Sequence, residues 1–419
     1  MLRLNIPIAD FLNNLLAWGA QFDHFAVYPG NEYPDPYHQY DLLFAAGAKR
    51  IIQPDANFFD SLYQHWEKKP SWLFGYVSYD VKNELEKLQS RHPDNVEAPP
   101  LYFFEPEIVG YLRDGVLHLE TDGDDHELYR QIISTKADFA ALPKLDFTAS
   151  LASENYLQRV KGLQEHIQRG DIYEVNFCQE FFVEGANIDP IATFAALNRK
   201  AHPPFAAFLN LPHHAVMSAS PERYLQKQGN KLISQPIKGT ARRSSNEKED
   251  EQIRKHLHES VKERAENVMI VDLVRNDLSR VAAKASVHVP ELFGVHTFPT
   301  VHQLISTVTA TLANEKTWAD ALKSSFPMGS MTGAPKVRAM QLIEDYEVHK
   351  RGIYSGAIGY ITPKGDFDFN VVIRSLIYNK QSQYLSLSVG GAITILADAE
   401  AEYDECLLKA EALLGLFKS

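Results

Sequence analysis

Pro-Ile-Lys-Gly-Thr, at residues 236–240, is the most informative stretch of this sequence, and it follows a Ser-Pro-Glu-Arg segment at residues 220–223. A lysine attacks carbon only as the free amine, so a nucleophilic lysine needs surroundings that lower its pKa and a partner that handles protons. Two arginines at positions 242–243 supply nearby positive charge, which disfavours the ammonium form of Lys238. We therefore consider Lys238 a candidate nucleophile and Glu222 its acid–base partner, against the alternative of an ordinary surface lysine in a turn.

The composition is that of a soluble globular protein with an ample core. The chain has 419 residues, of which 45% are hydrophobic and 23% charged, enough for one large or two ordinary domains. Its net charge of −12 argues against a nucleic-acid partner or an anionic membrane surface. The two cysteines, Cys178 and Cys406, fit a reducing compartment and exclude a disulfide framework. No signal peptide or membrane-spanning run is recognisable, so we expect a cytoplasmic protein.

Strands and helices follow one another along the chain without the regular βαβ rhythm of a parallel sheet. Several predicted strands come in consecutive runs, which favours an α+β fold with antiparallel sheets. The pattern predicts a hairpin around residues 113–115 and helices at about 154–169, 246–274 and 399–417, with residues 142–153 as a connector.

Six short sequence motifs lie between residues 152 and 415, and the segments 220–223 and 236–240 belong to them. The motifs occur in the order found in the chorismate-utilising enzymes. The sequence resembles this family, which comprises anthranilate, aminodeoxychorismate, isochorismate and salicylate synthases. The resemblance implies two large antiparallel β-sheets packed as a sandwich, with helices outside. Residues 1–145 would contribute strands to the sandwich, and residues 152–419 would form the chorismate-binding catalytic region.

The residue at position 238 distinguishes members of this family. A lysine in Pro-Ile-Lys-Gly-Thr is typical of component I of aminodeoxychorismate synthase, whereas the anthranilate enzymes carry a small residue, usually alanine. The resemblance implies that Lys238 attacks ring carbon 2 of chorismate while Glu222 protonates the departing 4-hydroxyl group, and that ammonia then adds at carbon 4. The product would be 4-amino-4-deoxychorismate, on the route to 4-aminobenzoate and folate. The alternatives are component I of anthranilate synthase and a non-catalytic chorismate- or tryptophan-binding regulatory subunit.

Ammonia is expected to come from a partner, because neither cysteine stands in the glycine-flanked setting of a glutamine-hydrolysing nucleophile. Cys178 lies in Asn-Phe-Cys-Gln, and Cys406 lies in a predicted helix. The resemblance implies that a glutamine amidotransferase subunit supplies the ammonia.

Two glutamate pairs are predicted to hold a magnesium ion. Glu263 and Glu266 are three residues apart on one predicted helix, and Glu402 and Glu405 have the same spacing on another, so each pair shares a helix face. Taken alone, each pair is equally compatible with a solvated helix edge or a helix N-terminus. The resemblance places the pairs opposite each other around Mg²⁺, which also holds a substrate carboxylate. We expect Glu266 and Glu405 to lie nearest to the ion and the other two to act through water.

Chorismate carries two carboxylates, so the site needs two anion-binding groups. Arg374 stands among β-branched residues and is predicted to lie in a strand, where it would capture a carboxylate or pair with Asp366 or Asp368. The segment 326–336 puts Pro335 at the start of a helix whose N–H groups would bind an anion or simply pack the core. The resemblance adds Gly239, Thr240, Gly333, Tyr354, Gly390, Gly391 and Lys409 as substrate-binding residues and His302 as a catalytic residue facing the ring.

Two positions depart from the usual family pattern. Glu174 stands where the amination enzymes commonly have glutamine and where the isochorismate and salicylate enzymes have a water-activating lysine. Residues 390–394, Gly-Gly-Ala-Ile-Thr, contain fewer glycines than the usual family version, which leaves the backbone contact with substrate open. Glu174 thus argues against an isochorismate or salicylate synthase and leaves the assignment to amination intact.

Overall fold

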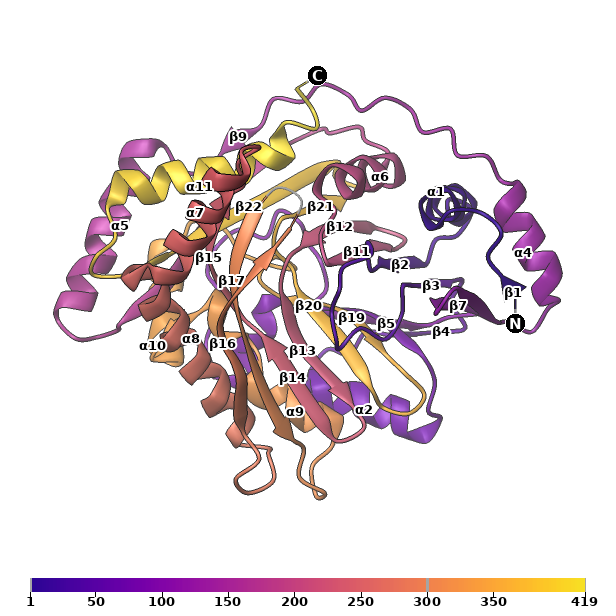
Figure 1. Ribbon diagram of the computed structural model, residues 1–419, viewed down its shortest axis with the longest axis horizontal. Coiled ribbons are helices and arrows are strands. Elements are labelled where there is room, and N and C mark those ends of the chain that lie inside the picture. The colour runs from indigo at the N-terminus through magenta and orange to yellow at the C-terminus, as the bar shows by residue number, and fades with distance from the viewer. Residues whose placement is uncertain (1, 299–300, 419) are drawn as a thin grey trace.

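Antiparallel strands from the whole length of the chain form two large sheets in the computed structural model, which describes residues 2–298 and 301–418 (Figure 1). The predicted α+β class with two large antiparallel sheets is confirmed. The 12-stranded sheet runs in the order β1 (Leu2–Arg3), β8 (Val116–Glu120), β7 (Ile108–Arg113), β3 (Leu42–Ala46), β2 (Phe25–Pro29), β11 (Phe205–Asn210), β12 (His214–Ser220), β21 (Ser375–Asn379), β22 (Tyr384–Ile393), β10 (Glu174–Val183) and β18 (Gly333–Ala334), with β9 (Thr148–Ala149) beside β10. The 10-stranded sheet runs in the order β15 (Ile237–Arg242), β17 (Val301–Thr311), β14 (Lys231–Gln235), β13 (Arg223–Gln228), β20 (Phe367–Val371), β19 (Ala357–Ile361), β5 (Leu73–Val77), β6 (Leu101–Glu105) and β4 (Arg50–Ile52), with β16 (His288–Thr297) beside β17.

The strands of residues 1–145 are divided between the two sheets. β1, β2, β3, β7 and β8 belong to the 12-stranded sheet, and β4, β5 and β6 belong to the 10-stranded sheet. β2 pairs with β11, and β5 pairs with β19, so the N-terminal strands hydrogen-bond directly to strands from the rest of the chain.

Helices cover the outer faces of the sheets (Figure 1). The 12-stranded sheet packs against α1 (Ile8–Gly19), α4 (Asp125–Ser134), α5 (Ser153–Gln168), α6 (Pro190–Ala201), α10 (Lys336–Tyr346) and α11 (Ala399–Leu414). The 10-stranded sheet packs against α2 (Phe58–Lys68), α8 (Val261–Ser279) and α9 (Trp318–Ser325), and α7 (Glu247–Glu259) lies along β15 and β16. The short elements are α3 (Lys82–Leu85) and two 3₁₀ turns, Tyr79–Val81 and Gly329–Met331. Among the described residues, no helix combines the length and the apolar character needed to cross a bilayer.

The central strands of the 12-stranded sheet are buried on both faces. Successive side chains of a strand point to opposite faces. In β3, Leu42 and Phe44 belong to the core beneath the helices, whereas Leu43 and Ala45 belong to the core between the sheets. The continuous apolar run in this strand therefore reflects two cores, one on each face of the sheet.

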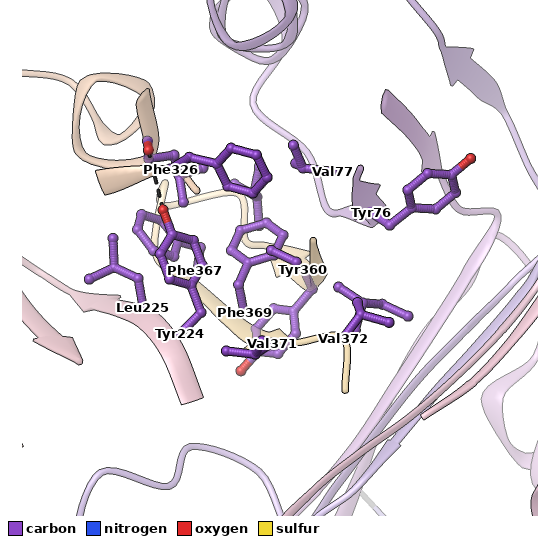
Figure 2. Packing of buried hydrophobic residues seen from close by; sticks show 14 of the residues in the cluster. Tyr76, Val77, Tyr224, Leu225, Phe326, Tyr360, Phe367, Phe369, Val371 and Val372 are labelled. Carbon is purple, nitrogen blue, oxygen red and sulfur yellow. Dashed lines mark hydrogen bonds between the residues drawn. The ribbon is translucent and has the colours of Figure 1, made fainter. Parts of the chain in front are cut away.

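Aromatic side chains fix the start of β13 against the neighbouring strand β20 and the end of α9 (Figure 2). Tyr224 packs edge-to-face on Phe326 with a ring separation of 6.2 Å, and its hydroxyl donates to the carbonyl of Leu322 at 3.3 Å. Phe367 and Phe369 of β20 pack on each other at 5.6 Å. Rings of this size contribute much of the buried apolar area of a core. They hold the strand that begins directly after Glu222.

Arg223, the first residue of β13, forms a buried ion pair on the other side of this strand. Its Nε and Nη2 atoms each lie 3.0 Å from an oxygen of Asp368, and its Nη1 lies 2.6 Å from Asp35. The guanidinium is only 1% exposed. Asp366 instead binds Lys227, at 3.2 Å. Both aspartates considered as partners for Arg374 are therefore engaged by other cations.

Replacing Arg223 by methionine is expected to destabilise the protein by about 3–5 kcal/mol, because two carboxylates are then left buried without their cation. Urea unfolding followed by circular dichroism measures the change. The matched control is Arg254→Met, which removes an exposed arginine paired with Glu251 on α7 and should leave the midpoint almost unchanged. Equal midpoints for the two variants would contradict the argument.

Three local predictions meet the structure with different results. The helix expected at 154–169 is α5, and the hairpin around 113–115 is β7–β8, with φ angles of 51° and 72° at Asp114 and Gly115 as a tight hairpin turn requires. The single helix expected at 246–274 is wrong, because the chain breaks at Ser260. There ψ is 116°, and the Ser260 side chain accepts the N–H of Glu263, so that it caps α8. Val261, the first residue of α8, is 82% exposed, as expected at the start of a new helix rather than in the buried face of a continuous one.

Candidate active site

One cavity gathers most of the predicted site residues, and its lining includes residues of α8, α11 and strands of both sheets. The helices α8 and α11 lie at the left of Figure 1. The cavity opens between β15 of the 10-stranded sheet and β22 of the 12-stranded sheet. Thirteen predicted residues line it: Glu222, Lys238, Gly239, Thr240, Glu263, Glu266, Tyr354, Arg374, Gly390, Gly391, Glu402, Glu405 and Lys409. The structure thus brings together residues from distant parts of the chain.

Lys238 projects from β15 and pairs with a buried carboxylate. Its Nζ lies 2.9 Å from Oε1 of Glu174, and the two side chains are only 10% and 1% exposed. Burial favours a lower pKa for Lys238, but the negative charges of Glu174 and Glu266 and the hydrogen bond to Glu174 outweigh it and raise the pKa. The expectation that the surroundings lower this pKa is therefore wrong for the free site. Arg243, expected to contribute, binds Asp250 instead, at 2.8 Å.

Glu222 occupies the turn between β12 and β13. Its backbone N–H donates to Ser220 Oγ at 3.2 Å, and its carbonyl accepts the N–H of Val371 at 3.0 Å. Burial raises the pKa of the Glu222 carboxyl to about 7, against the opposing charge of Lys238. A carboxyl group with such a pKa is suited to donate a proton near neutral pH and to take it back later.

The glutamates of α8 and α11 face each other across the cavity, with two lysines among them. Lys262 Nζ lies 3.2 Å from Glu402, and Lys409 Nζ lies 2.7 Å from Glu405 and 2.9 Å from the carbonyl of Gly390. Burial opposes ionisation of Glu405, but Lys409 lowers its pKa on balance. The negative charge on α11 is therefore partly neutralised by lysines.

Glu266 differs from Glu263, Glu402 and Glu405 because one of its oxygens is buried without a partner among the described residues. Its Oε1 is buried and accepts no hydrogen bond from the residues that the structure describes, and burial raises the pKa of Glu266 to about 7. Within residues 2–298 and 301–418, no three His, Cys, Asp or Glu side chains come close enough together to enclose a metal ion. The orphaned oxygen and the all-carboxylate set nonetheless suit Mg²⁺, which takes few protein ligands and keeps several waters.

Arg374 presents a guanidinium to the cavity without a carboxylate partner. The prediction of a strand position is wrong: the residue lies between β20 and β21, with φ of 52°. In the described part of the chain, no carboxylate lies within ion-pair distance of it. Burial lowers its pKa, so a bound anion would restore the lost solvation. Arg374 is thus well placed to bind a carboxylate of a ligand.

Two glycines are needed for close approach around the glutamates. Gly239 has φ of +86°, and a Cβ there would lie 2.8 Å from Oε2 of Glu263. A Cβ at Gly391 would lie 3.2 Å from Oε2 of Glu402. Side chains at either position would push against the glutamates that line the cavity.

Two predicted site residues are placed outside the cavity lining. His302 is buried in β17, where Nε2 lies 3.0 Å from Asp250 and Nδ1 lies 3.0 Å from Thr297. Gly333 pairs with Val175 of β10 and has a φ of +150°. A Cβ at this position would lie 2.2 Å from the carbonyl oxygen of Glu174, so there is no room for a side chain. Both residues hold neighbouring segments together.

The cavity also contains polar residues that the sequence analysis did not select: Asn176, Lys262, Gln303, Ser330 and Ser388. Lys262 directly precedes Glu263, and Ser330 lies within the segment 326–336, so proximity to chosen motifs is a usable signal for these two. Gln303 directly follows the predicted residue His302, whereas no directly adjacent predicted residue marks Ser388. Their position depends on strand register, which is set by pairing between distant segments.

Comparison with known proteins agrees with this geometry. Residues 25–415 match the family described as chorismate binding enzyme. The chain is 37% identical over 350 residues to aminodeoxychorismate synthase component 1 of Klebsiella aerogenes, covering 82% of this chain and 77% of that protein. It is 34% identical over 398 residues to anthranilate synthase component 1 of Thermus thermophilus, covering 89% and 85%.

The fold has a counterpart among solved structures. The crystal structure of anthranilate synthase component I from Streptococcus pneumoniae superposes with a TM-score of 0.77 at 26% identity, over 93% of this chain and 92% of that one. The family match covers every strand of the two sheets except β1 and every element that lines the cavity. This chain therefore belongs to the chorismate binding enzyme family.

Proposed function

We propose that this chain aminates chorismate at carbon 4 to give 4-amino-4-deoxychorismate, the reaction of aminodeoxychorismate synthase component 1. Overall identity does not separate this reaction from anthranilate synthesis, because relatives named for each are 37% and 34% identical. The observation that carries the proposal is Lys238, a buried amine that lines the cavity together with the acid Glu222. Anthranilate synthesis requires no such nucleophile.

The cavity supplies a binding group for each carboxylate of chorismate. Arg374 offers a guanidinium at one side that pairs with no carboxylate in the described part of the chain, and Lys409 stands beside the glutamates at the other side. An arginine binds a carboxylate with two parallel hydrogen bonds, which fixes the orientation of the ring. The reacting carbons would then lie against Lys238 and Glu222.

Glu266 and Glu405 would bind Mg²⁺ directly, and Glu263 and Glu402 would act through water. The ion would supply positive charge to a substrate carboxylate that otherwise meets four glutamates. The ion pair between Lys262 of α8 and Glu402 of α11, at 3.2 Å, supports the placement of a positive charge in this gap.

The reaction follows from two proton-handling groups and one nucleophile. The free amine of Lys238 forms a bond to ring carbon 2, the double bonds shift, and the bond from carbon 4 to its hydroxyl breaks while Glu222 donates a proton to form water. Ammonia then attacks carbon 4, the electrons of the carbon–nitrogen bond return to Lys238, and Glu222 takes the surplus proton from the new amino group. Lys238 is then a free amine again and Glu222 is protonated again, as both were before the bond to carbon 2 formed.

Ammonia would come from a glutamine amidotransferase subunit, in a cytoplasmic complex. Component 1 in the names of the relatives indicates a second component. Cys178 and Cys406 are both buried, and burial raises the pKa of each thiol, so neither is suited to hydrolyse glutamine. Two reduced, buried thiols also fit the cytoplasm.

Turnover of chorismate by the wild-type chain with Mg²⁺ and an ammonium salt tests the proposal directly. Products are separated by chromatography, with and without added aminodeoxychorismate lyase. We expect 4-aminobenzoate only when the lyase is present. Direct release of anthranilate or isochorismate would overturn the proposal, and absence of turnover would favour a regulatory chorismate-binding subunit.

A further inference from the structure

The buried pair of Glu174 and Lys238 joins the two sheets beside the cavity. Glu174 is the first residue of β10 in the 12-stranded sheet, whereas Lys238 belongs to β15, at the edge of the 10-stranded sheet. Their 2.9 Å contact is within the range for direct proton transfer. In the described part of the chain, no other carboxylate lies within ion-pair distance of Lys238 Nζ.

Glu174 carries one carboxylate oxygen that no donor satisfies. In the described part of the chain, its buried Oε2 atom has no hydrogen-bond partner, which leaves the cost of burying that polar atom uncompensated by any hydrogen bond. The ion pair with Lys238 is the main compensation. A ligand that displaces water from the cavity removes solvation from the charged pair of Lys238 and Glu174. The free energy of the ion pair then rises relative to that of the neutral amine and the neutral carboxylic acid. Substrate binding would therefore favour transfer of the proton to Glu174.

We propose that Glu174 is the base that deprotonates Lys238 and later returns the proton. This inference rests on the proposed function. A proton moves from Nζ to Oε1, leaving a free amine and a carboxylic acid, and the electron pair of the amine forms the bond to ring carbon 2. When ammonia displaces the lysine, those electrons return to Nζ and the proton moves back from Glu174. Glu222 handles only the protons of the departing hydroxyl and the incoming ammonia.

The other charged groups around Lys238 have different tasks or partners. On α7, Asp250 is bound by Arg243 and His302. Glu222 must keep its proton for the leaving group. The remaining charged groups that line the cavity are Lys262, Glu263 and Glu266 on α8, Arg374 between β20 and β21, and Glu402, Glu405 and Lys409 on α11.

The test compares wild type with Glu174→Gln, which keeps the shape of the side chain but accepts no proton. Formation of the covalent adduct between Lys238 and chorismate is followed by intact mass spectrometry from pH 6 to 9, without ammonia. In the variant, Lys238 must lose its proton to solvent. We expect its rate at pH 7 to be about 10²-fold below wild type. The ratio of variant to wild-type rates should rise as the pH rises, by about tenfold per unit, since each unit increases the free-amine fraction tenfold.

Two further variants separate this role from a merely structural one. Glu174→Asp retains an acceptor and should keep a pH-independent rate ratio to wild type. Glu180→Gln removes another buried carboxyl from the same strand, one hydrogen-bonded to Tyr384 and Ser386 outside the cavity lining, and should behave as wild type. A pH-independent ratio for Glu174→Gln would overturn the proposal. Thermal unfolding checks that each variant is folded.

A second readout does not depend on the reaction. Acetylation of Lys238 by acetic anhydride, quantified by peptide mass spectrometry, reports its free amine as a function of pH. Removing the adjacent negative charge should move the midpoint down by about one to three pH units in Glu174→Gln. An unchanged midpoint would also overturn the proposal. If wild type forms no adduct with chorismate, the proposed function fails, while the acetylation profile still tests the coupling of the pair.

Discussion

Replacing Lys238 by alanine is expected to lower the formation of 4-amino-4-deoxychorismate by roughly 10⁴-fold or more, the scale of loss seen when a covalent nucleophile is removed. The cavity would keep Arg374 and the glutamates, so chorismate should still bind. Ammonia would then have direct access to ring carbon 2. We expect the residual product to shift towards anthranilate. Chromatography of products from chorismate, Mg²⁺ and ammonium measures both effects.

Two controls make this result specific. Lys238→Arg keeps the positive charge beside Glu174, but a guanidinium is not deprotonated in proteins, so this variant should fold and still be inactive. Lys231→Ala removes an exposed lysine of β14 that stacks on Tyr37, and it should retain wild-type turnover. Continued 4-amination by Lys238→Ala would show that a covalent lysine intermediate is not required.

The parts of the site that the sequence predicts are those carried by local motifs. Lys238 and Glu222 are recognisable because they lie in the segments 236–240 and 220–223, which resemble motifs of the family, and both line the cavity. Spacing on a helix puts each glutamate pair on one face, and this survives the unpredicted helix break at Ser260, whereas the placement of the two pairs opposite each other is implied only by the family resemblance. Ser260 with Glu263 three residues later is a pattern typical of a helix N-terminus, but the continuous apolar spacing predicts an unbroken helix, and the structure shows the break in the Ser260 ψ of 116°.

The remaining features depend on contacts between distant segments. The local sequence around Arg374 favours a strand, and the left-handed φ of 52° reflects the crossing from one sheet to the other between β20 and β21. The raised pKa of Lys238 arises from Glu174, which lies in the other sheet and far away in the sequence. The adjacent arginines suggested the opposite direction because proximity in sequence was taken for proximity in space. Electrostatic arguments of this kind need the fold.

Replacing Glu222 by glutamine is expected to slow adduct formation by about 10²–10⁴-fold, because the 4-hydroxyl then departs without a proton donor. The glutamine keeps the size of the side chain. The matched control is again Glu180→Gln, since burial also raises the pKa of Glu180 to about 7 but the residue lies outside the cavity lining. That control should react at the wild-type rate. Equal loss in both variants would indicate a general effect on the fold.

The pH dependence of the wild type tests the same assignment independently. A general acid acts in its protonated form, and burial raises the pKa of Glu222 to about 7. The rate of adduct formation should therefore be highest below neutral pH and fall as the pH rises through about 7. Measuring the first half of the reaction without ammonia removes the pH dependence of the ammonia supply. In Glu222→Gln, the rate of adduct formation should no longer decrease as the pH rises through about 7. If the rate of the variant still decreases above about pH 7, another group donates the proton and Glu222 only shapes the cavity.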